Sequence, residues 1–177
     1  MKLNINTIIS IVIITVVFLL NGCKKDDTYS IIPSINYKGY VIQKSISGKD
    51  SALKLTISYT DGDGDLGLGQ KDTNPPFDTG IYYYNMYVYY YEYINGKWSE
   101  VTLTGFPNDT DTIRIKYRFA NLTPVSENKT IKGDIENTFS LPSRNSITTI
   151  KLKFCIYDRM LYKSNVDSTG IITYYNP

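Results

Sequence analysis

The segment 61–67, Asp-Gly-Asp-Gly-Asp-Leu-Gly, is the strongest candidate for chemistry in the sequence. Asp61, Asp63 and Asp65 place carboxylates at alternate positions, and the intervening glycines let the backbone curl tightly enough to aim them inward. Carboxylates about 4 Å apart repel by about 1 kcal/mol per pair even in water. A hard cation relieves this repulsion, and Ca²⁺ suits flexible loops with oxygen ligands. The segment therefore predicts a structural Ca²⁺ site, the alternative being a solvated Asp-Gly turn.

The spacing resembles the first half of an EF-hand calcium loop. Asp72 falls at the twelfth position counted from Asp61, where that loop places its closing carboxylate. Leu66 departs from the pattern, because an EF-hand has its sharp-turn glycine at this sixth position. The flanking segments also alternate as strands, so we expect a related ligand arrangement in a loop between strands. The ligands expected for it are Asp61, Asp63, Asp65 and Asp72.

Catalytic constellations are scarce in this sequence. It contains no histidine, which removes the commonest general base and the commonest metal ligand. Cys155 therefore has no histidine to activate it, and we expect it to be a small residue within a strand. The net charge of +2 does not suggest a nucleic-acid-binding protein. We expect a non-enzymatic binding or structural module, the alternative being a carbohydrate-active or other carboxylate-dependent hydrolase.

Tyrosine is unusually frequent, with 17 copies, and many of them lie in the segment Tyr82–Ile94. Strand alternation sends Tyr83, Tyr87, Tyr89 and Tyr91 to one face and Met86 with Val88 to the other. Only one face can be the core, so we expect an aromatic outer face able to stack on sugar rings. The partner would be a glycan or a protein. The alternative is that a second element covers these rings.

The residue pattern predicts β-strands throughout the body of the chain. Leu53, Leu55 and Ile57 alternate with polar residues, which is typical of a strand with one buried and one wet face. Asn95-Gly96 predicts a tight hairpin between two strands. The predicted strands are Ile35–Ile42, Leu53–Tyr59, Tyr82–Ile94, Trp98–Leu103, Ile113–Phe119, Thr130–Ile135, Ile150–Ile156 and Ile171–Tyr175. About eight strands without helices predict an all-β fold, a single immunoglobulin-like antiparallel β-sandwich.

The N-terminus follows an export pattern. Lys2 precedes a hydrophobic run, Ile8–Leu20, which is shorter than the ~20 residues that a membrane-spanning helix needs. Leu20-Asn21-Gly22-Cys23 resembles the lipobox of bacterial lipoproteins, which implies cleavage before Cys23 and lipidation of its thiol. An uncleaved membrane anchor is the alternative. We therefore predict a signal peptide (1–22), a lipidated tether (23–34) and a β-sandwich domain (35–177).

Lys24-Lys25-Asp26-Asp27 is similar to the surface-export signal of Bacteroidota lipoproteins. The body of the chain also resembles uncharacterised immunoglobulin-like lipoproteins of that group, through Ile57-Ser58-Tyr59-Thr60, the Asp-Gly loop and Phe154-Cys155-Ile156-Tyr157-Asp158-Arg159. The resemblance implies an outer-membrane lipoprotein, anchored by lipid and facing the cell exterior.

A loop between the last two strands is a further expectation from similarity to bacterial immunoglobulin-like domains. It would run from Asp158 to Asn165 and lie at the same end of the sandwich as the loop 61–72. Asp158 or Asn165 could then complete the oxygen shell of a cation. The alternative is a capped turn.

Overall fold

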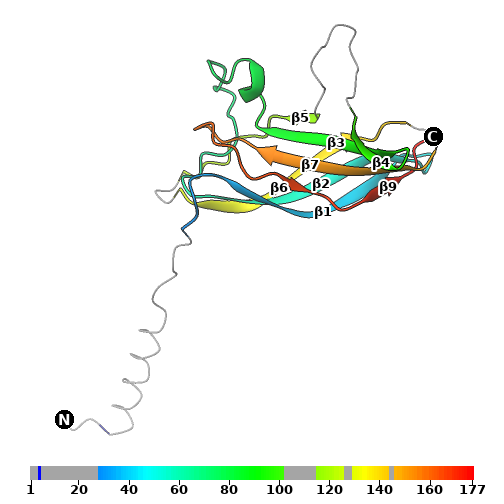
Figure 1. Ribbon diagram of the computed structural model, residues 1–177. Helices are drawn as coiled ribbons and strands as arrows, with labels where there is room; N and C mark the ends of the chain where they lie inside the picture. The colour runs from blue at the N-terminus through cyan, green and yellow to red at the C-terminus, as the bar shows by residue number, and fades with distance from the viewer. Residues whose placement is uncertain (1–3, 5–27, 102–114, 126–128, 144–145) are drawn as a thin grey trace.

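The computed structural model describes residues 4, 28–101, 115–125, 129–143 and 146–177 (Figure 1). The predicted signal peptide, the lipobox with Cys23 and the predicted export signal lie outside the described residues. Among the described residues the fold is all-β, with a single turn of 3-10 helix, η1. The elements are β1 (Ser34–Lys44), β2 (Asp50–Asp61), η1 (Gly80–Tyr82), β3 (Met86–Ile94), β4 (Lys97–Glu100), β5 (Ile115–Tyr117), β6 (Ile131–Ser140), β7 (Thr148–Ile156), β8 (Asp167–Ser168) and β9 (Ile172–Tyr174).

These strands form two antiparallel sheets. The first has the order β1-β2-β6. The second has the order β4-β3-β7-β8, with β5 also pairing with β3 and β9 also pairing with β7. The strands that follow β2, β5 and β6 each lie in the other sheet, which agrees with the connectivity of an immunoglobulin-like sandwich. The predicted fold class is confirmed.

The core lies between the two sheets and follows the alternation of the sequence. Leu53, Leu55 and Ile57 of β2 point inward and are fully or almost fully buried. Ile150, Leu152 and Phe154 do the same on β7. Their polar neighbours face outward, as expected for strands with one buried and one wet face. Cys155, on the outer side of β7, is also buried.

The aromatic segment departs from the prediction at its start. Strand β3 begins at Met86 instead of Tyr82, because the preceding residues belong to η1 and the turn after it. Arg118 holds this turn by donating a 2.6 Å hydrogen bond to the backbone oxygen of Tyr83. The predicted hairpin is confirmed, with Asn95 and Gly96 both at positive φ, 51° and 81°.

The ends of β2 and β7 lie at the same end of the sandwich, and the chain also enters there (Figure 1). The backbone amide of Gly62, just after β2, donates a 2.8 Å hydrogen bond to the backbone oxygen of Ser30. The opposite end carries the β3–β4 hairpin and the C-terminus. The fold thus separates an entry end, where the Asp-Gly loop lies, from a far end.

Candidate metal site

Asp61 is the last residue of β2 and continues its inward-facing row. Its side chain is therefore carried into the interior, and the residue is 0% exposed. Asp63 and Asp65 follow in the loop, and carboxylate oxygens from the three residues lie within 4.8 Å of one another. This triad can hold a metal ion.

The glycines of the loop are needed for close packing as well as for curling. A Cβ atom on Gly62 would collide with the backbone oxygen of Tyr29, and one on Gly64 with that of Lys129. Gly67 lies equally close to the backbone of residue 120. Gly64 and Gly67 also have positive φ, 64° and 85°, a conformation that side chains disfavour. Backbone carbonyls of three distant segments thus pack against the loop and restrict its backbone conformation.

Asp158 approaches the triad from the other sheet, close enough for the charges of all three aspartates to raise its pKa. It follows β7 and forms a backbone bridge with Leu66, and it is 3% exposed. The next two residues bind the loop: the amide of Arg159 donates to the backbone oxygen of Asp65 at 3.3 Å, and that of Met160 to Asp65 Oδ2 at 2.9 Å. The expectation that the loop starting at Asp158 lies at the same end of the sandwich as the loop 61–72 is confirmed, but this loop is followed by two short strands, β8 and β9, instead of one.

Each of these four carboxylates has one buried oxygen with no hydrogen-bond partner among the described residues. These atoms are Asp61 Oδ1, Asp63 Oδ1, Asp65 Oδ1 and Asp158 Oδ2. In three cases a backbone amide holds the other oxygen: Asp65 N binds Asp61 Oδ2 at 3.0 Å, Met160 N binds Asp65 Oδ2, and Tyr162 N binds Asp158 Oδ1 at 2.7 Å. A buried carboxylate oxygen without a partner is costly, and a cation is the ligand that offsets this cost. The backbone therefore orients the side chains while leaving one oxygen of each available.

The electrostatics of the group agree with this. Burial, together with the neighbouring carboxylates, raises the pKa of Asp158 to about 7. Burial and the charges of Asp63 and Asp65 raise the pKa of Asp61 to about 6. The pKa of Asp65 is raised too, first by burial and then by Asp63. Negative charge is thus concentrated here beyond what the surrounding groups compensate.

Arg159 is the basic side chain nearest in sequence to Asp158, but its guanidinium forms hydrogen bonds with other residues. It donates to the backbone oxygen of Gly67 at 3.2 Å, to Asn121 Oδ1 at 2.8 Å and to Thr123 Oγ1. Its charge lowers the pKa of Asp65 only as a secondary effect. Arg159 therefore fastens the loop to residues 121–123. The sequence alone gave no sign of this role.

Asp72 and Asn165 are placed differently from the expectation. Asp72 Oδ2 accepts a 2.6 Å hydrogen bond from the amide of Gly69, so this carboxylate closes its own turn and is not part of the triad. Asn165 Oδ1 accepts from the amide of Ile35 at 2.8 Å, while its Nδ2 donates to the backbone oxygen of Ile35 at 2.9 Å. Asn165 thus fastens β1 to the β7–β8 connection. The fourth carboxylate beside the triad is that of Asp158.

The predicted stacking tyrosines do not form one platform. Tyr87 is buried, because η1 and Tyr157 cover it: its hydroxyl donates to the backbone oxygen of Ile81 at 2.5 Å, and the ring of Tyr157 packs edge-on at 5.9 Å. Tyr83 is exposed but packs against Tyr84, outside β3. Tyr89 and Tyr91 are half-buried on the outer face of β3.

The exposed aromatic pair lies further along the same strand. Tyr93 and Trp98 face each other across the β3–β4 hairpin, with ring centroids 5.3 Å apart. They are 50% and 39% exposed. The Asn-Gly turn was the signal for this pairing, because a two-residue hairpin loop fixes the register of its strands.

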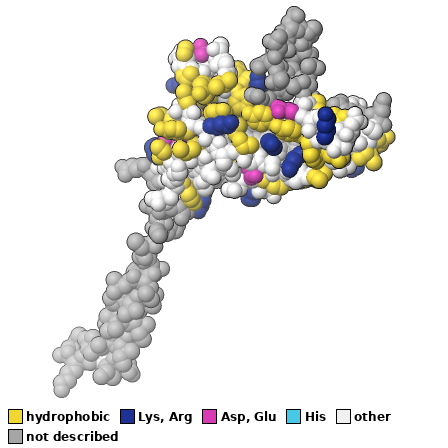
Figure 2. All heavy atoms as spheres, in the orientation of Figure 1, with side chains coloured by type: hydrophobic (Ala, Val, Ile, Leu, Met, Phe, Trp, Pro, Cys, Tyr) yellow, Lys and Arg dark blue, Asp and Glu magenta, His cyan; other side chains and the backbone are white. Residues whose placement is uncertain are grey.

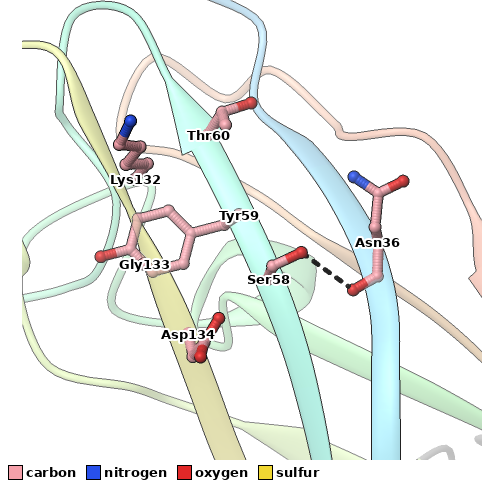
Figure 3. A pocket seen from close by; sticks show the side chains of 7 residues that line it. All are labelled: Asn36, Ser58, Tyr59, Thr60, Lys132, Gly133 and Asp134. Atoms are coloured by element: carbon pink, nitrogen blue, oxygen red, sulfur yellow. Dashed lines mark hydrogen bonds between the residues drawn. The ribbon is translucent and has the colours of Figure 1, made fainter.

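A shallow groove of about 280 Å³ lies on the first sheet, between β1, β2 and β6 (Figure 3). The ring of Tyr59 lies over Gly133, where a Cβ atom would approach its hydroxyl to 2.8 Å. The one carboxylate of its lining, Asp134, forms an ion pair with Lys38 at 2.7 Å. This lining does not supply the two facing carboxylates that glycoside hydrolysis uses. The residues shown in Figure 3 are Asn36, Ser58, Tyr59, Thr60, Lys132, Gly133 and Asp134.

Within the described part of the chain, no helix has the length and apolar character needed to cross a membrane. Comparisons of the chain with protein-family models, with curated proteins and with solved structures found no match.

Proposed function

We propose that this chain is a lipid-anchored, surface-exposed envelope module without enzymatic activity, stabilised by Ca²⁺ bound to the Asp-Gly loop. The observation that carries the metal proposal is the set of four buried carboxylate oxygens without partners, contributed by Asp61, Asp63, Asp65 and Asp158. Their convergence is the chemistry of a hard-cation site.

Ca²⁺ fits this donor set better than other common ions. The grouped ligands are all carboxylates, whereas zinc sites favour the nitrogen and sulfur of His and Cys. Mg²⁺ demands a strict octahedron and keeps several waters, whereas Ca²⁺ accepts about six to eight oxygens in irregular geometry. Four carboxylates together with backbone carbonyls or water reach that number.

The position of the site supports a role beside the membrane anchor. Ser30, within the predicted tether, accepts a hydrogen bond from the amide of Gly62 in the Asp-Gly loop. A cation held by Asp61 and Asp158 would join the ends of β2 and β7 at the point where the tether meets the domain. In this proposal the ion stiffens the anchored end, and the far end extends away from the membrane.

Lipid labelling tests the anchor. Cells expressing the wild-type chain should incorporate radiolabelled palmitate into it, and Cys23→Ala should abolish both the labelling and the cleavage of the precursor. Cys155→Ala is the matched control, because that thiol is buried in β7 and should not affect labelling. Equal labelling of Cys23→Ala and wild type would refute the anchor.

Thermal unfolding tests the metal. The melting temperature should be higher in millimolar Ca²⁺ than in chelator, because an ion that binds only the folded chain stabilises it by about 2.7 kcal/mol at a hundredfold excess over Kd. Mg²⁺ should have a smaller effect. Identical melting in chelator and in about 10 mM Ca²⁺, roughly tenfold above the weakest Kd known for extracellular sites, would refute Ca²⁺ binding.

A further inference from the structure

The outer face of the second sheet carries an ordered array of aromatic, hydroxyl and amine groups at the far end of the domain. Met86, Val88 and Tyr90 point into the core, so the alternate residues of β3 point outward. The register then places Trp98 opposite Tyr93, and Lys151 opposite Tyr91.

Thr149 and Lys153 extend the same outward row of β7 on either side of Lys151. We call this surface the aromatic–lysine face; its residues are Tyr91, Tyr93, Trp98, Thr149, Lys151 and Lys153.

The hairpin does not depend on the exposed aromatic pair for its register. Tyr93 and Trp98 flank a two-residue turn that Asn95 and Gly96 already specify by their backbone conformation. Their rings are tilted by 57° and contact each other, with about half of one and two-fifths of the other left in water. Tyr and Trp are enriched at binding interfaces, because each combines a large apolar ring with a polar group.

The net charge of this face is positive, because it carries two lysines and one carboxylate, that of Glu100. The ion pairs among the described residues, Lys38–Asp134, Lys44–Asp50 and Lys54–Glu136, all join strands of the first sheet. Lys151 and Lys153 take no part in them, and Lys153 Nζ lies 5.1 Å from the centre of the Tyr91 ring. The carboxylate of Glu100, opposite Tyr91 on the same face, accepts a 3.1 Å hydrogen bond from the Tyr91 hydroxyl. In Figure 2, Lys or Arg side chains lie among hydrophobic ones over the surface that β3 and β7 form.

These groups match the chemistry of an acidic sugar polymer. Aromatic rings stack on the apolar faces of sugar rings, threonine hydroxyls bind sugar hydroxyls, and lysine amines bind carboxylate or sulfate groups. Successive outward residues on a strand are about 6.6 Å apart, so the face offers repeated contacts along an extended chain. We infer that the aromatic–lysine face binds an anionic polysaccharide, such as a uronic acid polymer. This inference does not involve the metal site.

Affinity electrophoresis of the purified protein in native gels tests the inference. Polygalacturonate in the gel should retard the protein, whereas neutral dextran and the non-sugar polyanion polyglutamate should retard it much less. Trp98→Ala and Tyr93→Ala should each weaken the apparent affinity by about threefold to tenfold, the effect of one lost aromatic contact. Trp98→Phe should keep most of it.

Matched control variants distinguish binding by the aromatic–lysine face from general effects of losing a tyrosine or reversing a charge. Tyr40→Ala removes an exposed tyrosine of the first sheet, 37% exposed, and should bind like wild type. Lys151→Glu with Lys153→Glu should abolish retardation, whereas Lys71→Glu, on a distant loop, should not. Each variant is compared only if its melting temperature stays near that of the wild type. The results should be the same in Ca²⁺ and in chelator, which separates a failure here from a failure of the metal proposal.

Absence of retardation by polygalacturonate would overturn the inference. So would polyglutamate or dextran acting as strongly as polygalacturonate, since binding would then need only charge or only a sugar. Trp98→Ala and Tyr93→Ala variants that both bind like the folded wild type would place the binding elsewhere and would also overturn it.

Discussion

The two ends of the domain treat polar and apolar groups in opposite ways. At the entry end, Asp61 and Asp158 are buried in the company of like charges. At the far end, the large apolar rings of Tyr93 and Trp98 remain partly exposed to solvent instead of being buried in the core. Stability alone would favour exposed carboxylates at the entry end and buried aromatic rings at the far end. We attribute the difference to the two ligands proposed above, a cation at the entry end and an anionic polysaccharide at the far end.

The two ends should also respond differently to mutation, because close backbone contacts hold the Asp-Gly loop at the entry end, whereas Tyr93 and Trp98 at the far end are partly exposed. The largest effect is expected at Gly64. Gly64→Ala must adopt a φ of 64° and displace the backbone of residue 129, so we expect a destabilisation of about 4 kcal/mol or more, or failure to fold. Gly48→Ala is the matched control, since Gly48 has a φ of 80° but open space around it. It should cost only about 1 kcal/mol. If urea unfolding shows the same loss of unfolding free energy for both variants, the loop is not held by close backbone contacts.

The second effect is a dependence of stability on pH in chelator. The pKa values of Asp61 and Asp158, about 6 and about 7, lie above the value of an unfolded chain, so the folded state binds more protons than the unfolded state between about pH 4 and pH 7. Stability is therefore greatest below about pH 4 and falls as the pH rises through 6 and 7, by at most about 1.4 kcal/mol per pH unit for each group. Saturating Ca²⁺ should remove the decline at pH 6 to 7. A chelated protein whose urea midpoint rises over this interval would contradict the buried carboxylate group.

The smallest effect on stability is expected at the far end. Trp98→Ala and Tyr93→Ala should change the free energy of unfolding by no more than about 0.5 to 1 kcal/mol, because both residues are partly exposed and a cross-strand pair contributes no more than this. The β3–β4 register rests on the turn and on backbone pairing. A loss above about 2 kcal/mol in either variant would assign these rings to packing. The contrast between the two ends would then disappear.

The sequence predicted those parts of the fold that depend on local pattern. The alternation of Leu53 to Ile57 and the Asn95-Gly96 turn translate directly into strands and a hairpin, because side-chain period and turn conformation are local properties. The acidic triad was found for the same reason. Asp158 could be predicted as a ligand only from the topology, because it follows another strand and is about a hundred residues away from the triad in the sequence.

The expectations that differ from the structure depend on contacts that no local pattern contains. Counting along the chain placed Asp72 with the triad. After Gly67, however, the chain pairs with residue 120, and Arg118 then holds the backbone oxygen of Asp72 at 2.6 Å. Alternation placed Tyr87 on an open face, but η1 folds back over it. In both cases a tertiary contact between distant segments decides the position.

Calorimetric titration of Ca²⁺ into matched variants tests the central claim most directly. Asp158→Asn keeps the shape of the side chain and removes a charged ligand, so binding should weaken by at least about tenfold, equivalent to about 1.4 kcal/mol. Asp72→Asn removes the same charge from a carboxylate that only closes its own turn, and it should bind Ca²⁺ like the wild type. Loss of binding in Asp72→Asn with wild-type binding in Asp158→Asn would contradict the account, as would a wild-type protein that takes up no Ca²⁺.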